Sequence, residues 1–310
     1  MSLKPEVRRS DLEAALADLR YSLRLIRKNP LVAVGGIMAL GFITLSVIAR
    51  VIVDPKQQVA FDFARSYCWG SSLFSWGAGT AACPPSELHY LGTDGFGRDL
   101  LKMIILAIPL DLQIALTIVA TATAFGVTIG AIAAYAGGKI DEIILRITDI
   151  FFAFPGLVLA LVFAAVLGRT ITNLTLAVLV VWWPTYVRLI RGQILSEKER
   201  SYVEALRALG IGRIRILFRH IIPNAIYPVL VQSTLDVGGV VLTFSALMFL
   251  GFSPSPVIPE LGLLAADGFT HVFTAPWLIF FPGLTIVLLS LSFNLVGDGL
   301  RDVLDPRLRR

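Results

Sequence analysis

The stretch EALRALGIGRIRILFRHIIPN, residues 204 to 224, is a basic segment set between long runs of apolar residues. Gly210 and Gly212 permit a sharp turn in it, because glycine tolerates positive φ angles. On both sides of the turn, apolar residues recur at helical spacing. These are Tyr202, Val203, Leu206 and Leu209 before the turn, and Ile214, Leu217, Phe218, Ile221 and Ile222 after it. The pattern predicts a short helix, a glycine turn and a second, amphipathic helix.

The chain around this segment is too apolar for a soluble protein. Of its 310 residues, 56% are hydrophobic and 16% are charged, with a mean hydropathy of +0.77, whereas soluble domains carry about 25% charged residues. Several apolar runs reach the roughly 20 residues that cross a bilayer as a helix. We therefore expect an all-α polytopic protein of the cell membrane. The formal net charge of +5 shows an excess of basic residues. In a membrane protein such an excess indicates the orientation of the spans more than nucleic-acid binding, so no nucleic-acid partner is expected.

Six membrane-spanning helices are expected. Their approximate ranges are 31–53, 106–136, 143–168, 172–192, 226–250 and 275–298. The third and fourth spans are separated only by the sequence GRTIT, which predicts a tight antiparallel pair. The last five spans form a core over residues 106–300, and the loop 193–225 is inserted into it.

Lys and Arg residues indicate the orientation of the spans. The first 30 residues contain seven, the region 188–219 contains eight, and the tail from Arg301 contains four. The loop 54–105 contains only Lys56, Arg65, Arg98 and Lys102. By the positive-inside rule, both termini and the 193–225 loop lie in the cytoplasm, and the loop 54–105 lies on the extracytoplasmic side.

The segments outside the spans have separate expected roles. Residues 1–30 are expected to form an amphipathic helix along the cytoplasmic membrane surface, in contact with lipid, in preference to a protein-docking element. Residues 301–310 form a cytoplasmic tail. Cys68 and Cys83, the two cysteines of the chain, lie in the extracytoplasmic loop. A disulfide between them is favoured over two free thiols and would add about 3 kcal/mol of stability.

Motifs for catalysis or metal binding are absent from the sequence. It contains no GxxxxGK[ST] phosphate loop, no HExxH motif and no GxSxG motif. Its three histidines, His89, His220 and His271, are divided between the two faces of the membrane in the expected topology. We therefore expect no catalytic residue, no metal site and no cofactor in this chain.

Asp149 is the clearest ionisable residue inside an expected span, and two interpretations of it stay open. We favour a local ion pair with Arg146, near the cytoplasmic surface. The alternative is a proton relay, because carboxylates within membranes are often functional.

The helix before Gly210 has the shape of a plug for a groove on another protein, because it projects between two spans and ends at a rigid turn. The same pattern fits a basic hairpin that rests on lipid head groups. Amphipathic spacing alone does not separate these two interpretations.

EALRALG followed by RHIIPN resembles the EAA loop of the membrane subunits of binding-protein-dependent ABC importers. Glu204, Ala205, Gly210 and Pro223 match that motif, whereas Leu206 replaces its third residue. Four further segments are similar, in the same order, to the C-type permeases of dipeptide, oligopeptide and nickel importers. They are LGTDGFGRDLL (91–101), AYAGGKIDEIILRITDIFFAFPGLVLA (134–160), LMFLGF (247–252) and FNLVGDGLRDVLDPRLR (293–309). The resemblance covers residues 30 to 310.

The resemblance implies a type I ABC importer permease fold and one permease half of a five-part importer. The implied partners are a B-type permease, two ABC ATPase subunits that carry ATP and Mg²⁺, and an extracytoplasmic substrate-binding protein. The helix over 201–209 would seat in a cleft of the ATPase, so that the 201–212 loop couples the subunits. The coupling residues would be Glu204, Ala205, Leu206, Arg207 and Gly210, with Arg219, Pro223 and Asn224 as support. Outside the membrane, Asp94, Arg98 and Asp99 either meet the binding protein or brace their loop.

The chain departs from this branch in two segments. Leu261 precedes Gly262 where the branch has tryptophan, and KMIILAIPLDLQIAL (102–116) replaces a stretch with small residues and an arginine. We expect short peptides as the cargo, with oligosaccharides or nickel as alternatives, because selectivity in such importers resides largely in the binding protein. A stand-alone secondary carrier is a further alternative, which the EAA-like loop disfavours.

Overall fold

A computed structural model describes residues 30–53, 82–87, 89–95, 97–255 and 258–304. These residues form helices, joined by turns and loops and by one isolated bridge between Thr93 and Asp99. The longer helices are α2 (Pro30–Ile52), α4 (Leu100–Ala136), α5 (Gly138–Phe152), α6 (Gly156–Leu167), α7 (Ile171–Glu197), α11 (Tyr227–Leu247), α12 (Leu261–Thr270) and α13 (Trp277–Leu304). The shorter ones are α8 (Ser201–Ala208), α9 (Arg213–Ile216), the π-helical η1 (Leu217–Ile221), α10 (Ile222–Ala225) and the π-helical η2 (Met248–Phe252).

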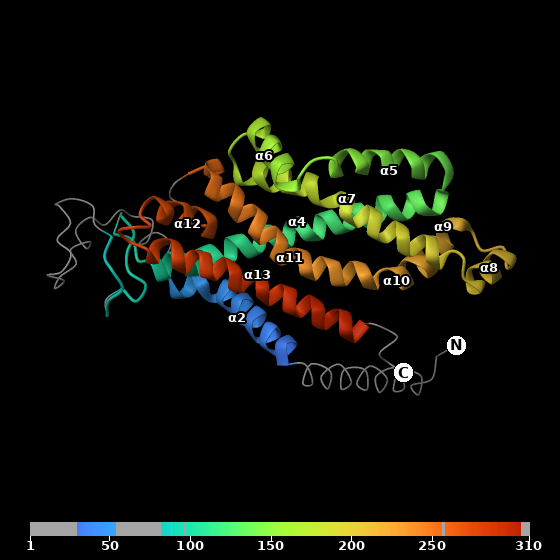
Figure 1. Ribbon diagram of the computed structural model, residues 1–310. Coiled ribbons are helices and arrows are strands. Elements are labelled where there is room, and N and C mark those ends of the chain that lie inside the picture. The colour runs from blue at the N-terminus through green and yellow to red at the C-terminus, as the bar shows by residue number, and fades with distance from the viewer. Residues whose placement is uncertain (1–29, 54–81, 88, 96, 256–257, 305–310) are drawn as a thin grey trace.

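Helix α4 runs through an elongated bundle (Figure 1). It packs most extensively on α7 and also contacts α11 and α2, while α13 packs on α2, α11 and α12. Helix α12 lies at one end of the bundle and α8 at the other. These are called the α12 end and the α8 end below.

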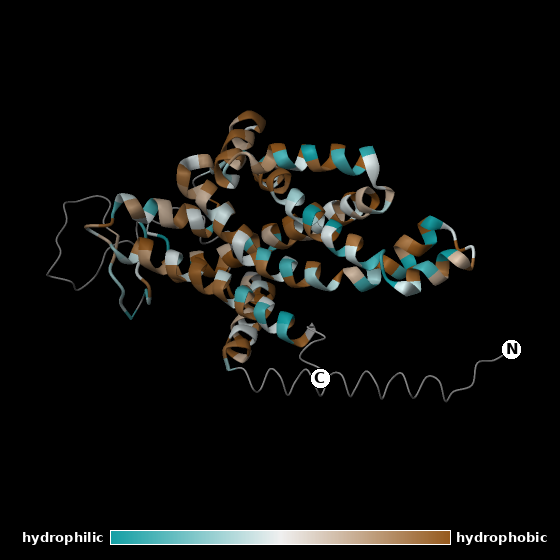
Figure 2. Ribbon diagram, turned by 45° about the vertical axis from the view of Figure 1, so that its right-hand side comes forward, coloured by the Kyte–Doolittle hydropathy of each residue, from teal (hydrophilic) through white to brown (hydrophobic). Residues whose placement is uncertain are grey.

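Five helical segments are long and apolar enough to cross a membrane: α2, α4, α7, α11 with η2, and α13. Helices α5 and α6 add a sixth if the bent pair counts as one span. Figure 2 shows apolar residues along the length of the bundle, with polar residues gathered at the α8 end and along α5. Many large apolar side chains, such as Val51 and Val166, are exposed on the outside. This distribution fits a protein that lipid surrounds, and it confirms the predicted helical membrane fold.

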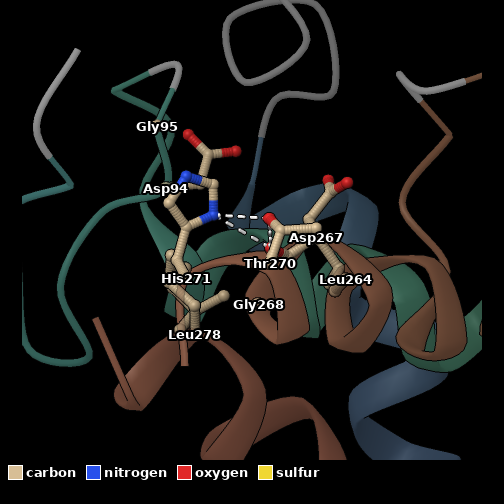
Figure 3. A pocket seen from close by; sticks show the side chains of 9 residues that line it. Asp94, Gly95, Leu264, Asp267, Gly268, Thr270, His271 and Leu278 are labelled. Atoms are coloured by element: carbon tan, nitrogen blue, oxygen red, sulfur yellow. Dashed lines mark hydrogen bonds between the residues drawn. The ribbon is translucent and has the colours of Figure 1, made fainter. Parts of the chain in front are cut away.

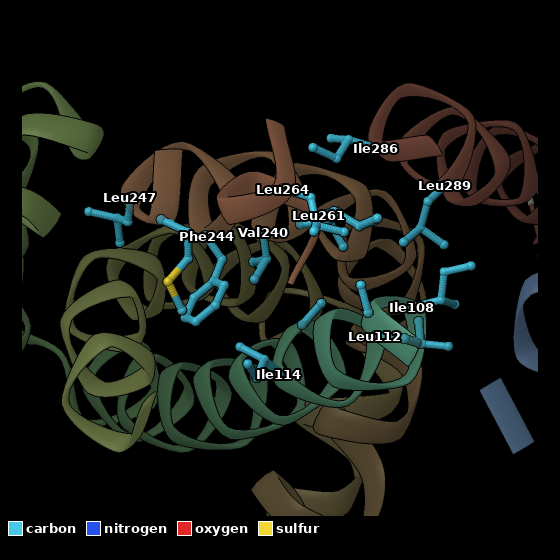
Figure 4. Packing of buried hydrophobic residues seen from close by; sticks show 14 of the residues in the cluster. Ile108, Leu112, Ile114, Val240, Phe244, Leu247, Leu261, Leu264, Ile286 and Leu289 are labelled. Atoms are coloured by element: carbon cyan, nitrogen blue, oxygen red, sulfur yellow. The ribbon is translucent and has the colours of Figure 1, made fainter. Parts of the chain in front are cut away.

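Two clusters of buried apolar residues hold the bundle together. One joins α4, α11, α12 and α13 towards the α12 end, and Figure 4 shows Ile108, Phe244 and Leu264 within it. The other joins α4 and α7 to the short helices towards the α8 end, through residues such as Ile190 and Ile216. Both ends of the bundle are therefore anchored to α4.

Helices α4 and α7 approach closely at two glycines of α4. A Cβ atom built on Gly126 would lie 2.6 Å from Tyr186 Cβ, and one built on Gly130 would lie 2.6 Å from the Val187 carbonyl oxygen. Any side chain at either position would push the two helices apart. Small residues permit this approach, which gives helices in lipid the van der Waals contact that holds them together.

The predicted third span, 143–168, is not one straight helix. Helices α5 and α6 are bent by 89° at the break between Phe152 and Gly156. Pro155 lies in this break; it lacks an N–H donor and disfavours helical geometry at the residue before it. Helix α5 lies alongside α7, where Arg191 donates to both carboxylate oxygens of Asp141 at 2.7 and 2.6 Å. Charged residues along α5 thus find partners on α7.

The predicted local pair between Arg146 and Asp149 is wrong. Asp149 accepts a hydrogen bond from Arg188 of α7, whose guanidinium also lies 4.2 Å from the centroid of the Phe152 ring. Arg146 donates instead to Glu142, one turn earlier, at 2.6 Å. The prediction considered only α5, whereas the packing of α7 beside α5 brings a second arginine to Asp149.

The other predicted spans are present with shifted ends. Helix α4 begins earlier than expected, at Leu100, because the Asp99 carboxylate caps it by accepting from the Lys102 amide at 3.0 Å. Helix α7 continues beyond residue 192 to Glu197. Residues 1–29 of the predicted surface helix 1–30, residues 54–81 of the loop with Cys68, and residues 305–310 of the predicted tail 301–310 lie outside the described residues.

We predict that Gly126→Ala lowers the free energy of unfolding by roughly 1–3 kcal/mol, because the added methyl group cannot fit against the backbone of α7. Thermal unfolding of the purified protein in detergent measures the effect. Gly41→Ala in α2 is the matched control, since nothing lies within 4 Å of a Cβ atom built there. A Gly126→Ala protein as stable as the control would contradict the close contact.

Candidate functional site

Helix α8 and the turn after it project from the α8 end of the bundle (Figure 1). The predicted helix over 201–209 is present as α8, which ends one residue earlier. Its buried residue is Val203, which joins the apolar cluster of α4 and α7. The residues predicted to couple to a partner are exposed, or half-buried in the case of Leu206: Glu204, Ala205, Leu206, Arg207 and Gly210. The structure therefore presents them on one short, accessible element.

The turn after α8 requires glycine at Gly210. Its φ angle is +73°, in the left-handed region that other residues rarely adopt. The Ile211 amide then donates to the Leu206 carbonyl at 3.2 Å, which closes the end of the helix. Gly212 has a φ of −62° and needs no glycine. Leu209, predicted on the apolar face, is 76% exposed.

The predicted second helix of the loop is divided into α9, η1 and α10, and its predicted apolar face is partly wrong. Ile214 and Phe218 are 76% and 50% exposed, whereas Leu217 and Ile221 are buried as expected, together with Ile216. The cause is the π-helical turn η1, which has more residues per turn than an α-helix. A face assigned at α-helical spacing therefore does not continue through it.

A polar network ties α8 to the spans on both sides. The Tyr202 hydroxyl donates to Glu197 Oε2 at 2.9 Å, and Arg200 Nε lies 3.0 Å from Glu197 Oε1. Asn224 Nδ2 donates to the Tyr202 hydroxyl at 3.4 Å and to the His220 carbonyl at 3.0 Å. Burial raises the pKa of Tyr202, so its hydroxyl keeps the proton that it donates to Glu197. Helices α7, α8 and α10 therefore meet at Tyr202.

Sequence reasoning named only one member of this network. Asn224 was predicted as a supporting residue and contacts α8, while the other two predicted supports, Arg219 and Pro223, are exposed. Glu197 and Tyr202 were missed as site residues. They lie on either side of a helix boundary, and only the turn between α7 and α8 brings their side chains together.

At the α12 end, the predicted cluster of Asp94, Arg98 and Asp99 is divided between two contacts. Arg98 Nε lies 2.5 Å from Asp94 Oδ2, and the Arg98 amide donates to Asp94 Oδ1 at 2.8 Å. Asp99 caps α4 and lies 2.9 Å from His89 Nδ1. All three predicted residues are buried. Their contacts lie within the loop, at the start of α4 and, for Arg98, near Asp267 of α12. Cys83 in the same region is buried and disulfide-bonded; its predicted partner lies outside the described residues.

A pocket of about 250 Å³ opens at the α12 end between this loop, α12 and the start of α13. Figure 3 shows Asp94, Asp267 and His271 around it. Arg98 Nη2 lies 4.0 Å from Asp267 Oδ2. Burial raises the pKa of Asp267, and the Arg98 charge offsets part of this rise. Among the described residues, no group of three or more His, Cys, Asp and Glu side chains is arranged to hold a metal ion.

A second cavity, of about 420 Å³, lies midway along the bundle between α4, α11 and α13. Its wall combines apolar residues with three hydroxyl side chains, Thr123, Ser233 and Thr234. Nearby, Gln232 donates to Asp236 Oδ1 at 2.9 Å. Asp236 is a carboxyl group within a span that sequence reasoning did not single out, although an acidic residue in an apolar run was the available signal.

The membrane bundle agrees with comparisons to known proteins. Residues 126–310 match the family model described as "Binding-protein-dependent transport system inner membrane component". The chain belongs to this family. It is 36% identical to the dipeptide transport system permease protein DppC of Alkalihalophilus pseudofirmus, over 96% of this chain and 93% of that protein.

Other relatives have related names. The chain is 41% identical to the dipeptide permease DppC of Haemophilus influenzae, over 72% of this chain and 75% of that protein. It is 37% identical to the oligopeptide permease OppC of Bacillus subtilis, over 73% of this chain and 74% of that protein. This protein is thus a multi-pass C-type permease subunit of an ABC importer, a non-catalytic membrane component whose ATPase is a separate subunit.

We predict that Tyr202→Phe loosens α8, because it removes the hydroxyl that Glu197 and Asn224 share. Loss of these hydrogen bonds should cost about 0.5–1.5 kcal/mol locally. Amide hydrogen exchange of residues 201–210 should accelerate, while that of α4 should stay unchanged. Tyr90→Phe is the control, since Tyr90 is exposed in the loop at the other end. Unchanged exchange over 201–210 would contradict the anchoring role of Tyr202.

Proposed function

We propose that this permease imports short peptides in an ATP-driven complex, forms half of the translocation pathway and couples to an ATPase subunit through the 201–212 loop. One observation carries the coupling role. Glu204 and Ala205 of the EAA motif lie on the exposed helix α8, and Gly210 forms the turn after it. The network around Tyr202 anchors α8 to the end of α7 and to α10.

The anchoring explains how force on α8 would reach the membrane. Glu197 is the last residue of α7, and Asn224 belongs to α10, which leads directly into α11. Helix α7 in turn packs closely on α4 at Gly126 and Gly130. A partner that moved α8 would therefore move these helices as a body, which is the rigid-body type of switching transition.

The surface of the loop favours a protein groove over lipid head groups as its partner. Leu209, Ile214 and Phe218 are exposed apolar residues beside the polar residues Glu204 and Arg207. A groove on an ATPase subunit would cover this mixture and shield the apolar side chains from water. In this arrangement the α8 end faces the cytoplasm, as the distribution of Lys and Arg predicts.

Peptides are the proposed cargo because the relatives are permeases of dipeptide, oligopeptide and glutathione transport systems. The proposed partners are a B-type permease, two ATPase subunits that bind ATP and Mg²⁺, and an extracytoplasmic substrate-binding protein. The cavity of about 420 Å³ between α4, α11 and α13, with its three hydroxyl groups, is the proposed contribution of this chain to the pathway.

We predict that Glu204→Ala and Gly210→Leu each reduce ATP-driven uptake at least tenfold, while the protein still inserts into the membrane. Glu204 provides the exposed polar contact, and a leucine at φ +73° strains the turn that orients α8. Uptake of labelled dipeptide into proteoliposomes of the assembled importer measures the effect. Ser201→Ala, an exposed change on the same helix outside the motif, should transport normally. Normal uptake by both motif variants would overturn the coupling role.

The cargo class is tested separately by competition. Unlabelled di- and tripeptides should displace the labelled peptide from the importer, and oligosaccharides and nickel should not. Displacement by an oligosaccharide or by nickel alone would replace the peptide assignment and leave the coupling role intact.

A further inference from the structure

Helix α12 is a short apolar helix held tightly at the α12 end of the bundle. It packs on α13, η2, α11 and α4. Gly262 lies against the backbone of Ser245, and Gly268 lies against the backbone of Leu278, so that neither position has room for a Cβ atom. A movement of α12 would therefore have to break its backbone contacts with α11 and α13.

Two carboxyl groups bind the first turn of α12. The Leu261 amide donates to Asp111 Oδ2 at 3.2 Å, and the Leu263 amide donates to Glu260 Oε2 at 2.7 Å. The Ser245 hydroxyl donates to Glu260 Oε1 at 3.2 Å. Asp111 belongs to α4, whereas Glu260 is the N-cap of α12 itself. One carboxyl group therefore joins α12 to another span, and the other caps the helix.

Both carboxyl groups are removed from water. Asp111 is 3% exposed and Glu260 is fully buried, within the apolar cluster that contains Leu112 and Leu264 (Figure 4). Among the described residues, no basic side chain contacts either group, and Asp111 Oδ1 has no hydrogen-bond partner. Two adjacent carboxylates without a counter-ion are costly in such surroundings.

Protonation of one member relieves this cost. Burial raises the pKa of Glu260 to about 7, although the amides of Gly262 and Leu263 and the Ser245 hydroxyl favour its charged form. A neutral Glu260 still accepts the hydrogen bond of the Leu263 amide through Oε2, so α12 keeps its cap without the cost of a buried charge.

We propose that Glu260 acts as a positioning residue that keeps its proton while α12 is packed against α4 and Asp111, and that loss of this proton releases α12. The proton leaves Glu260 for water, and the negative charge that results is buried without a basic partner. A role for this release of α12 in transport rests on the proposed function, in which substrate enters at the α12 end.

The other charged groups near α12 lie away from its first turn. Asp267 belongs to α12, His271 is the C-cap of that helix, and both line the pocket together with Asp94, whose partner Arg98 also lies near Asp267. Charged residues of the helices packed against α12 are placed elsewhere: Lys102 exposed at the start of α4, Asp236 beside Gln232 in α11, and Asp298, Arg301 and Asp302 at the far end of α13.

The pKa shift sets the direction of the pH effect. The packed state holds the proton up to about pH 7, whereas an unperturbed glutamate releases it near 4.5. The packing of α12 is therefore most stable at low pH and loses up to tenfold in equilibrium constant per pH unit between about 4.5 and 7. Above pH 7 Glu260 is deprotonated in both states, and its titration causes no further change.

Amide hydrogen exchange of residues 261–270 tests the proposed release of α12. The full chain is held in lipid nanodiscs with the subunits that co-purify. Rates between pH 5 and 8 are corrected for intrinsic exchange and compared with those of a segment of α13. We expect the protection of α12 to fall about tenfold per pH unit up to pH 7 and then to level off. A wild-type protein with constant protection would overturn the proposal.

The variant Glu260→Gln tests whether Glu260 is the titrating group. It keeps an amide oxygen as acceptor and removes the carboxyl group whose pKa burial raises. Protection should then be constant over the pH range, and retention of the wild-type slope would overturn the proposal. Asp111→Asn leaves Glu260 buried and should keep the slope.

Asp267→Asn and His271→Gln are the matched controls, since both residues are titratable and lie towards the C-terminal end of the same helix. Each should keep the wild-type slope, and loss of the slope in either one would overturn the assignment to Glu260. The measurement needs neither ATP nor a transported substrate. It can therefore fail while the proposed import of peptides holds, and the reverse is also possible.

Discussion

The close contact between α4 and α7 is the constraint on which most of the structure depends. In lipid, apolar surface gains little from association, so helices are held by short-range packing and by polar contacts. Gly126 and Gly130 allow the backbone of α7 to approach α4 directly. Because α7 ends in the network that anchors α8, this contact also determines where the candidate coupling helix projects. A change in the packing between α4 and α7 would therefore alter the position of α8.

Charged groups of the bundle are paired across elements distant in sequence. Arg188 and Arg191 of α7 bind Asp149 and Asp141 of α5 and hold that helix alongside the bundle after the break at Pro155. The α12 end has a different arrangement, because two carboxyl groups there meet the amides of a helix N-terminus in place of a basic side chain. An isolated charge in apolar surroundings is costly, so each arrangement restricts how the neighbouring helices can move.

The α8 end and the α12 end are suited to different tasks. At the α8 end, polar and apolar side chains are exposed on a short anchored element, as a docking surface requires. At the α12 end, the short helix α12 packs directly on the backbones of α11 and α13. In our proposal, this packing depends on protonation. Helix α4 runs from the α12 end towards the α8 end. A permease that alternates between two states needs both a place where force is applied and a place where the pathway is closed.

Sequence patterns alone determined the membrane class, most of the spans and the short helix before Gly210. These features depend on hydrophobicity and on local backbone preferences, which any single segment carries within itself. The break between α5 and α6 was missed although Pro155 was visible, because a proline in a span can kink a helix or end it. The surrounding helices decide between these outcomes.

Only the tertiary structure decided which polar groups meet. Arg188 rather than Arg146 binds Asp149, Tyr202 joins Glu197 to Asn224, and Asp111 reaches the first turn of α12 across 150 positions of sequence. The departures at residues 102–116 and at Leu261 were apparent in the sequence, but no local pattern showed that they adjoin one contact. The physical reason is that electrostatic and hydrogen-bonding partners are selected by distance in space, which depends on the packing of all the helices together.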